Sequence, residues 1–306
     1  MKLANPPRRH HYAPVFYLKR WAGVDGKVEQ FSRPAGQDVK ARRVSPTATG
    51  FADNLYAMPG LADHLVQQVE ERFMQELDNQ AAEVLAGLEK GPVAWTPATR
   101  SAWTRFIQSL QLRTPADVTG VRLRTLQDWG VSIPKIQEAY EAMRRIGDPA
   151  TFEEFMTTED PLLVERVAMK ALTVLIDGSK MGTFINNMIW EVIKLDDARV
   201  DLLTSDRPVE QVLGLGDPKS FLTVPIGPQR LFIAARQRST IDAILRASPT
   251  DVVRRRNRAT VCHARNFVWA IDRSQATFVA KHFASLPVPT LGERLAGRDD
   301  SAAARL

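Results

Sequence analysis

The chain has 306 residues, of which 44% are hydrophobic and 25% charged, so it can bury a sizeable core. A single cysteine, Cys262, excludes an internal disulfide framework and a cysteine-rich zinc site. No segment has the apolar length of a signal peptide or a membrane span, so we expect a cytoplasmic protein without a membrane partner. The net charge of +6 favours anionic partners without identifying one.

The first sixty residues predict short elements. Residues 1–9 are polar and proline-rich, and we expect them to form a flexible arm. A short helix is predicted to begin at Pro14 and to stop at Gly23, which is a natural C-terminal cap. Strands are predicted over 27–32, after a turn, and over 39–44.

The middle of the chain predicts helices. Apolar residues recur at spacings of three and four over 61–88, which indicates an amphipathic helix. Further helices are predicted to begin at Pro97, Pro115 and Pro134, because proline is well tolerated in a first helical turn. A last helix of this region is predicted over 161–175.

After residue 181 the pattern changes to strands alternating with short helices. The predicted strands cover 188–193, 200–204, 221–225, 230–235 and 266–271. The predicted helices cover 240–246, 249–265 and 274–283.

These elements predict a helix-rich α+β fold. A mixed or antiparallel sheet, built from the N-terminal and C-terminal segments, is expected to lie against a central helical region. Residues 10–285 would form a single globular domain, with a helical middle over 61–178 and an α/β part over 181–285. Residues 286–306, rich in charge with proline and glycine, would form a flexible tail.

Adjacent histidines open the first segment that could carry chemistry. His10 and His11 precede Tyr12, and neighbouring side chains of an extended chain face opposite ways, so one histidine can point inward and the other toward solvent. Histidine serves as acid, base or metal ligand near neutral pH. Alternatively, aromatic packing and one hydrogen-bonded histidine hold the segment in place. His11 is a catalytic candidate, His10 and Tyr12 are binding candidates, and a divalent metal is an open alternative.

Arg113 and Asp206 each end a predicted element. Arg113 closes an amphipathic helix, where a guanidinium can cap helix carbonyls or hold a phosphate or carboxylate. Asp206 follows Thr204 and Ser205 at the end of an apolar strand, where it could act as a base, bind a metal or orient a histidine. It could equally close the strand as an Asx turn. Arg113 and Asp206 are catalytic candidates, and Ser205 is a binding candidate.

The predicted helix over 249–265 carries a buried amide and a run of arginines. Asn257 falls on an apolar stripe and is expected to be buried. A buried amide without hydrogen bonds would cost about 1–3 kcal/mol of stability. Asn257 therefore either holds a neighbouring loop by hydrogen bonds or faces a site. Nine arginines between 230 and 265 stand against two aspartates. Such a run of arginines is suited to binding phosphate groups, although runs of this kind more often form a solvent-exposed helix face. The candidates here are Asn257 as a catalytic residue and, as binding residues, Arg254, Arg258, His263 and Arg265.

Several common sites have no sequence signature in this chain. We find no phosphate loop of the Walker type, no dinucleotide-binding glycine pattern and no His-Glu-x-x-His zinc motif. The Gly-x-Ser-x-Gly elbow of α/β-hydrolases is missing as well. The usual NTPase, dehydrogenase, zinc-protease and α/β-hydrolase interpretations therefore lose most of their support.

Four segments together resemble the bacterial family catalogued as domain of unknown function 4238, over residues 10 to 272. The opening pattern His-His-Tyr-x-Pro-x-Phe-x-Leu matches from His10 to Leu18. The later matches are Arg113-Thr114-Pro115, then Trp190 followed by Thr204 to Val209, then Asn257, Ala264, Arg265 and Val268. Val15 stands where the family usually has glutamine, and Trp21 where it usually has phenylalanine, and neither change touches a reactive group.

The resemblance implies no activity, because the family has none assigned. It does favour an arrangement in which His11, Arg113, Asp206 and Asn257 lie close together. Such a set suits an anionic substrate such as a phosphoester, with arginine for charge, histidine and aspartate for proton transfer or metal, and asparagine for orientation.

Three hypotheses follow. The leading one is a nuclease-like hydrolase acting on a phosphate-containing substrate, for which we hypothesise the context of a bacterial defence or toxin effector. The second is a non-catalytic module that binds nucleic acid or a protein through a basic C-terminal face. The third is a purely structural polar knot that links the N-terminus to the core.

Overall fold

In the computed structural model, strands from both ends of the chain pair with each other. The structure describes residues 8–34, 38–90 and 95–297. Strand β2 (Val28–Ser32) lies antiparallel to β10 (Val268–Ala270), and the four-stranded sheet runs β3-β2-β10-β6. Strand β3 is Lys40–Val44, and β6 is Thr204–Ser205. The predicted adjacency of N-terminal and C-terminal strands, and the helix-rich α+β class, are confirmed.

Two further sheets are also antiparallel. One runs β5-β9-β8-β7, from Ile189–Lys194, Arg230–Ala235, Phe221–Gly227 and Glu210–Val212. The other pairs β1 (Arg9–His11) with β4 (Phe51–Asp53). These strands thus form three sheets, where the sequence predicted one.

The predicted strand over 200–204 needs correction, because only Thr204 belongs to a strand. The backbone N–H of Leu202 donates to the Pro228 carbonyl, and that of Leu203 donates to the Asn257 side chain. These donors are therefore not available to a sheet ladder, and the segment runs as irregular chain into β6.

The helix predicted over 61–88 consists of three successive pieces. They are α2 (Asp63–Val66), the π-helix η3 (Val69–Met74) and α3 (Gln75–Lys90). Before them lie the short helices α1 (Val15–Leu18), η1 (Lys19–Trp21) and η2 (Pro46–Ala48). After them comes α4 (Pro97–Leu110), which begins with a capping box at Thr96.

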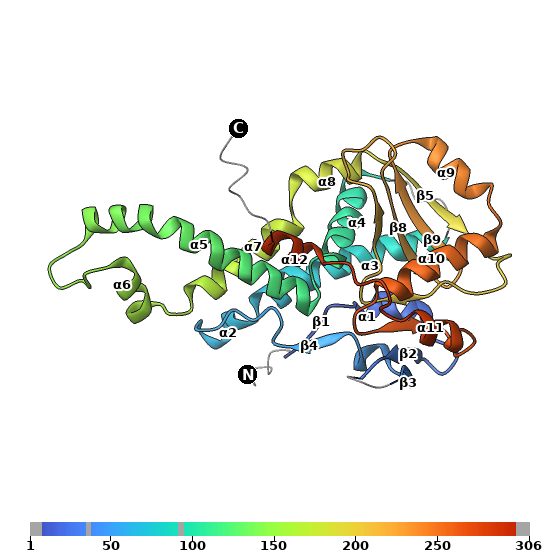
Figure 1. Ribbon diagram of the computed structural model, residues 1–306, viewed down its shortest axis with the longest axis horizontal. Helices are drawn as coiled ribbons and strands as arrows, with labels where there is room; N and C mark the ends of the chain where they lie inside the picture. Colours follow the sequence, from blue (N-terminus) through green and yellow to red (C-terminus); the bar gives the residue numbers. More distant parts are fainter. Residues whose placement is uncertain (1–7, 35–37, 91–94, 298–306) are drawn as a thin grey trace.

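A helical arm leaves the body of the molecule (Figure 1). It consists of the outer half of α5 (Pro115–Met143) with α6 (Phe152–Glu159) and α7 (Leu163–Ile176), and α8 (Ser179–Asn186) follows it. A helix was predicted to begin at Pro134, but α5 continues through this residue. Pro134 is exposed, so water can satisfy the helix carbonyl that its ring leaves without a donor.

The C-terminal helices are α9 (Arg238–Leu245), α10 (Pro249–His263), α11 (Ala276–His282) and α12 (Leu291–Ala296). Helix α12 lies in the stretch predicted to be a flexible tail, which corrects that prediction for these residues. It packs on α5 at two glycines: a Cβ added to Gly120 would lie 2.2 Å from the carbonyl carbon of Gly292. Residues 298–306 lie outside the described part.

Aromatic side chains join the helices to the sheets. Trp103 and Phe106 on α4 contact each other, with ring centroids 5.1 Å apart, and Trp103 also meets Phe232 on β9 edge to face. Tyr17 packs on Trp21 and Phe106 in the same cluster. Among the described residues, no helix combines the length and the apolar character that crossing a membrane requires.

Candidate anion-binding site

Arg113 lies at the centre of a buried polar cluster. Its side chain is 1% exposed, and its two terminal nitrogens hold the carboxylate of Asp78 at 2.8 and 3.1 Å. One of them also donates to the carbonyl of His11 at 3.1 Å. The hydroxyl of Tyr56 donates to the Arg113 carbonyl at 2.7 Å. We call His11, Tyr56, Glu70, Asp78 and Arg113 the Arg113 cluster.

Glu70 is the titratable member of this cluster. It lies on η3, and π-helical turns inside α-helices are frequent at functional positions. Burial raises the pKa of Glu70 to about 7, although Arg113 acts in the opposite direction. Its Oε2 and the Nε of Arg113 are both buried and have no hydrogen-bond partner within the described chain.

The two histidines face different environments, as expected for neighbours on a strand. His10 is fully buried, stacks on the Tyr56 ring, and accepts the Tyr56 backbone N–H at its Nδ1. His11 is half-buried; its Nε2 lies 3.3 Å from the Thr47 carbonyl, and its ring meets Phe51 edge to face. Burial lowers the pKa of His11.

Asp206 ties the end of α10 to the chain before β7. Its two carboxylate oxygens accept the backbone N–H groups of Arg265 at 3.0 Å and Asn266 at 2.6 Å. Burial raises the pKa of Asp206 and of Tyr12, to which Asp206 adds its negative charge. The preceding Ser205 is also buried. These bonds join Asp206 to residues far along the chain and are not the local bond of an Asx turn.

Asn257 is also fully occupied. Its side-chain oxygen accepts the Leu203 N–H at 2.8 Å, and its nitrogen donates to the Asp201 carbonyl at 2.8 Å and to the Gln275 side chain at 2.9 Å. It therefore pins the irregular chain before β6. The contacts within the described chain do not join the four catalytic candidates: Arg113 contacts the His11 carbonyl, whereas Asp206 and Asn257 make separate contacts. Their catalytic roles stay predictions.

The arginine run divides into paired and unpaired members. Arg256 is buried and donates to Thr260, while Arg265 holds the Glu293 carboxylate at 2.6 and 2.7 Å. Arg254 and Arg258, in contrast, are exposed and have no hydrogen-bond or ion-pair partner in the part of the chain that the structure describes. The basic face on α10 is therefore narrower than the run of nine arginines suggested.

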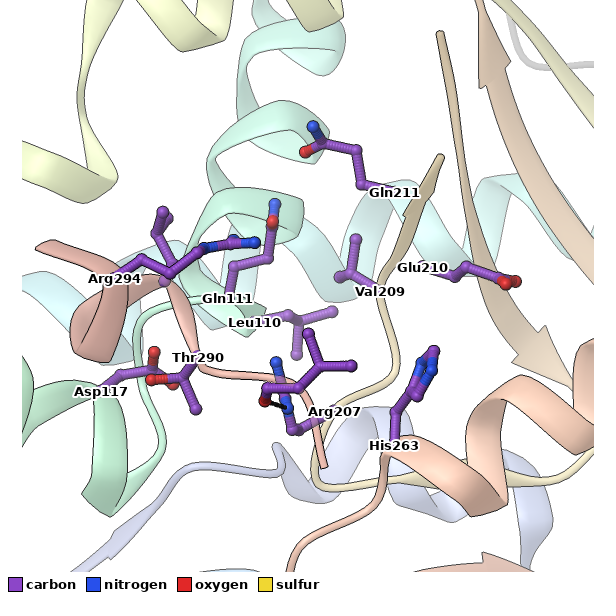
Figure 2. A pocket seen from close by; sticks show the side chains of 12 residues that line it. Leu110, Gln111, Asp117, Arg207, Val209, Glu210, Gln211, His263, Thr290 and Arg294 are labelled. Carbon is purple, nitrogen blue, oxygen red and sulfur yellow. Dashed lines mark hydrogen bonds between the residues drawn. The ribbon is translucent and has the colours of Figure 1, made fainter. Parts of the chain in front are cut away.

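A pocket of about 130 Å³ lies between segments that are far apart in the sequence (Figure 2). We call it the motif pocket, because three of its walls adjoin the Arg-Thr-Pro, Thr-Ser-Asp and Ala-Arg segments. A fourth wall comes from the C-terminal chain that leads into α12. The lining residues are Leu110, Gln111, Asp117, Arg207, Val209, Glu210, Gln211, His263, Val288, Thr290, Leu291 and Arg294.

Two guanidinium groups give the motif pocket its positive charge. Arg207 donates to the carbonyls of Val288 and Pro289 and forms no ion pair with a carboxylate of the described residues, and burial lowers its pKa. Arg294 is exposed and has no ion-pair partner among the described residues. Of the acidic lining groups, Asp117 is engaged by the hydroxyl of Thr114 and by the N–H of Gly292.

His263 and Glu210 form the titratable side of this pocket. Burial lowers the pKa of His263, as do Arg207 and Arg256, while Glu210 raises it. The net direction is downward, so the imidazole is largely neutral at pH 7 and can accept a proton. Glu210 lies 3.6 Å from the Arg256 side chain and accepts the Thr223 hydroxyl at 3.4 Å. Figure 2 shows Glu210 and His263 on the same side of the pocket.

Sequence reasoning found His263 as a binding candidate but missed most of its neighbours. Arg207 stands at the variable position of the Thr-Ser-Asp-x-Pro-Val segment, and Arg294 falls in the stretch predicted to be mobile. Glu70 and Asp78 of the Arg113 cluster look like ordinary polar positions of an amphipathic helix. Two steps of four residues link Glu70 to Asp78 through residue 74, and this helical spacing is the sequence signal for that pair. No group of three or more histidine, cysteine or acidic side chains within the described residues is placed to hold a metal ion.

The chain belongs to the family described as protein of unknown function (DUF4238), whose model matches residues 9–274. No match is found among curated proteins or among solved structures. The matched range includes the three motif-bearing walls of the pocket and ends before the fourth, which Val288 to Arg294 provide.

Proposed function

We propose that the protein is a hydrolase that binds a phosphate ester in the motif pocket, with His263 as its general base. One observation carries the proposal. The side chains of Arg294 and His263 and the Nε2 of Gln111 line the same pocket and have no hydrogen-bond partner among the described residues. Buried polar atoms are normally paired, and unpaired donors that converge on a concave surface are suited to a polar ligand.

The charge of the pocket favours an anion. Arg207 and Arg294 bring two guanidinium groups to it, and guanidinium binds phosphate oxygens in a bidentate way. Neither is ion-paired within the described chain. The desolvation of Arg207 has a cost that a bound anion would offset.

The neutral His263 suits general base catalysis. In the proposed step, its ring takes a proton from water while the water oxygen bonds to phosphorus and the ester P–O bond breaks. The leaving oxygen takes a proton from solvent, and the arginines stabilise the negative charge on the other phosphate oxygens. A correctly placed base contributes about 10²–10⁴ to such a rate.

The size of the pocket favours a phosphate that belongs to a larger molecule. Its volume of about 130 Å³ is below the ~300–1,000 Å³ of pockets that enclose a whole small ligand. A phosphodiester whose remaining atoms lie outside would fit this geometry. We therefore keep the nuclease-like substrate class, nucleic acid, as part of the proposal.

Cleavage assays test the proposal. Single- and double-stranded DNA and RNA, and bis(p-nitrophenyl) phosphate, would be incubated with the protein with and without Mg²⁺ or Mn²⁺. We expect His263→Ala to lower kcat by about 10²–10⁴. The matched control is His282→Ala on α11, which removes an imidazole outside the pocket. Full activity of folded His263→Ala would overturn the assignment.

The alternative is a non-catalytic module that binds nucleic acid through α10. The observation in its favour is that Arg254, Arg255 and Arg258 are exposed and unpaired within the described chain. His263 and Arg254 are nine residues apart, so they project from opposite sides of the helix and this face is separate from the pocket. Salt-sensitive binding without turnover, lost in an Arg254→Gln/Arg258→Gln variant, would favour this alternative.

A further inference from the structure

A second cavity, of about 420 Å³, lies beside the turn that joins β8 to β9. It shares no lining residue with the motif pocket. Its walls are η1, the turn itself, the chain before β6 and the chain after β10. We call it the hairpin pocket. Its volume is in the range of about 300–1,000 Å³ that is typical of pockets for small molecules.

The hairpin pocket is predominantly basic. Lys19, Arg20 and Arg230 line it, against one acidic side chain, that of Asp201. Arg230 is paired with Asp196 at 2.6 Å and also donates to the Gln229 carbonyl of the turn at 2.8 Å. Lys19 is exposed and has no hydrogen-bond or ion-pair partner in the described ranges, so its ammonium is available to a ligand. An anion would therefore gain charge-assisted hydrogen bonds here.

The backbone of Asp201 is fixed by two side-chain amides. Its carbonyl accepts two amide donors, from Asn257 and from Gln275, each at 2.8 Å. Asn257 also fixes Leu203, so the irregular chain that carries Asp201 has little freedom. The Asp201 carboxylate lines the pocket from this fixed backbone and can accept hydrogen bonds from ligand hydroxyl groups.

The remaining walls are apolar. Ile226, Pro228 and Ile271 line the hairpin pocket together with the charged groups. A ligand that fits has a phosphate for the basic side, hydroxyl groups for Asp201 and a ring that can lie on apolar side chains. We propose that the hairpin pocket binds a sugar phosphate, either free or as part of a mononucleotide.

The proposal gives Asn257 a role beyond packing. Through the backbone carbonyl of Asp201 it holds the chain segment that carries the one acidic side chain lining the pocket. This site is independent of the hydrolase proposal, because neither its residues nor its ligand depend on His263.

Calorimetric titration tests the hairpin pocket directly. To remove the motif pocket from the measurement, the protein would carry His263→Ala and Arg294→Gln. Ribose 5-phosphate, AMP, inorganic phosphate and ribose would be titrated into this background. We expect ribose 5-phosphate or AMP to bind more tightly than inorganic phosphate, and ribose without phosphate to bind weakest.

Two added substitutions separate the contributions. Lys19→Gln, at an exposed position, should weaken ribose 5-phosphate by about tenfold or more, as expected for one charged hydrogen bond. Asp201→Asn should weaken ribose 5-phosphate but not inorganic phosphate, since it replaces one of the two carboxylate oxygens that accept from hydroxyl groups by an amide donor and removes the negative charge. Lys180→Gln on α8 is the matched control and should change nothing.

Thermal unfolding of each variant shows whether it is folded. No saturable binding of any of the phosphate ligands by the folded background protein would overturn the proposal. So would ribose 5-phosphate affinity that is unchanged in both Lys19→Gln and Asp201→Asn. A failure here leaves the cleavage assays in the motif pocket unaffected, and the reverse also holds.

Discussion

The Arg113 cluster and the motif pocket differ in what their charged groups contact. Arg113 is held by Asp78 and by the His11 carbonyl, whereas Arg294 has no partner among the described residues. His11 lies against Thr47 and Phe51, whereas His263 faces a cavity. The histidine and arginine that the sequence singled out first contact other parts of the protein, and those beside the later motifs line the pocket.

This difference separates two uses of the same side chains. A buried ion pair whose two charges neutralise each other fixes how two segments pack. Removing one member leaves the other charge buried without a partner, which is destabilising. Unpaired polar groups at a concave surface keep their capacity to bind a ligand. The first region makes contacts of the kind expected for the structural polar knot, and the proposed hydrolase site lies in the second.

The largest expected effect is on stability, in the Arg113 cluster. Arg113→Met removes a buried guanidinium and leaves Asp78 without its bidentate partner, so we expect a loss of about 3–5 kcal/mol in the free energy of unfolding. Arg105→Met, at a surface pair with Asp177, should cost less than about 1 kcal/mol. Urea unfolding measures both, and equal losses would contradict the distinction between the two sites.

Glu70 should make the stability of the cluster depend on pH. Burial raises its pKa from an ordinary 4.5 to about 7, so the folded state keeps a proton that the unfolded state releases. That stability is complete below about pH 4.5 and is lost as the pH rises through 7. Glu70→Gln should match the wild type at pH 4.5 and exceed it by about 3 kcal/mol at pH 8.

The matched control is Glu71→Gln at the exposed neighbouring position, which should leave the pH profile of unfolding unchanged. A Glu70→Gln profile that runs parallel to the wild type from pH 4.5 to 8 would show that Glu70 titrates normally in the folded protein.

Asp206 should affect stability more than catalysis. Asp206→Ala leaves the N–H groups of Arg265 and Asn266 without their acceptor, so we expect a loss of about 1–3 kcal/mol. The folded fraction should keep the proposed hydrolytic activity, since Asp206 does not line the motif pocket. Loss of activity at full stability would instead restore Asp206 as a catalytic residue.

The smallest expected effect concerns Arg294. Its guanidinium is exposed and unpaired within the described chain, so Arg294→Gln should leave the unfolding midpoint nearly unchanged. It should weaken the binding of a phosphate ester to the motif pocket by about tenfold, the value of one charged hydrogen bond. Competition with inorganic phosphate in the cleavage assay measures this change, and an unaltered inhibition constant would remove Arg294 from the site.

Local patterns predicted many elements of this fold. Strands β8 and β9 and helices α4 and α10 lie close to their predicted ranges, because hydrophobic period and helix caps are properties of neighbouring residues. The irregular run before β6 depends on a partner more than fifty residues away, the side chain of Asn257. A sequence pattern carries no direct record of such partners.

The candidate site was harder to predict from the sequence for the same reason. Four separate segments meet in the motif pocket, and only His263 among its lining residues was a candidate from the sequence. Helix α12 could not be foreseen as a pocket wall, because the contact between Gly120 and Gly292 that seats it joins residues far apart in the chain. Composition in that stretch indicated a flexible tail.

Histidine-selective NMR compares the two regions in one sample. Imidazole resonances of the ¹⁵N-labelled protein would be followed while vanadate, an analogue of the phosphoryl transition state, is added. We predict that the His263 resonances, assigned with His263→Ala, shift until vanadate saturates the site, while the resonances of His10 and His11 do not change. Shifts at His11 without shifts at His263 would contradict it and return the site to the Arg113 cluster.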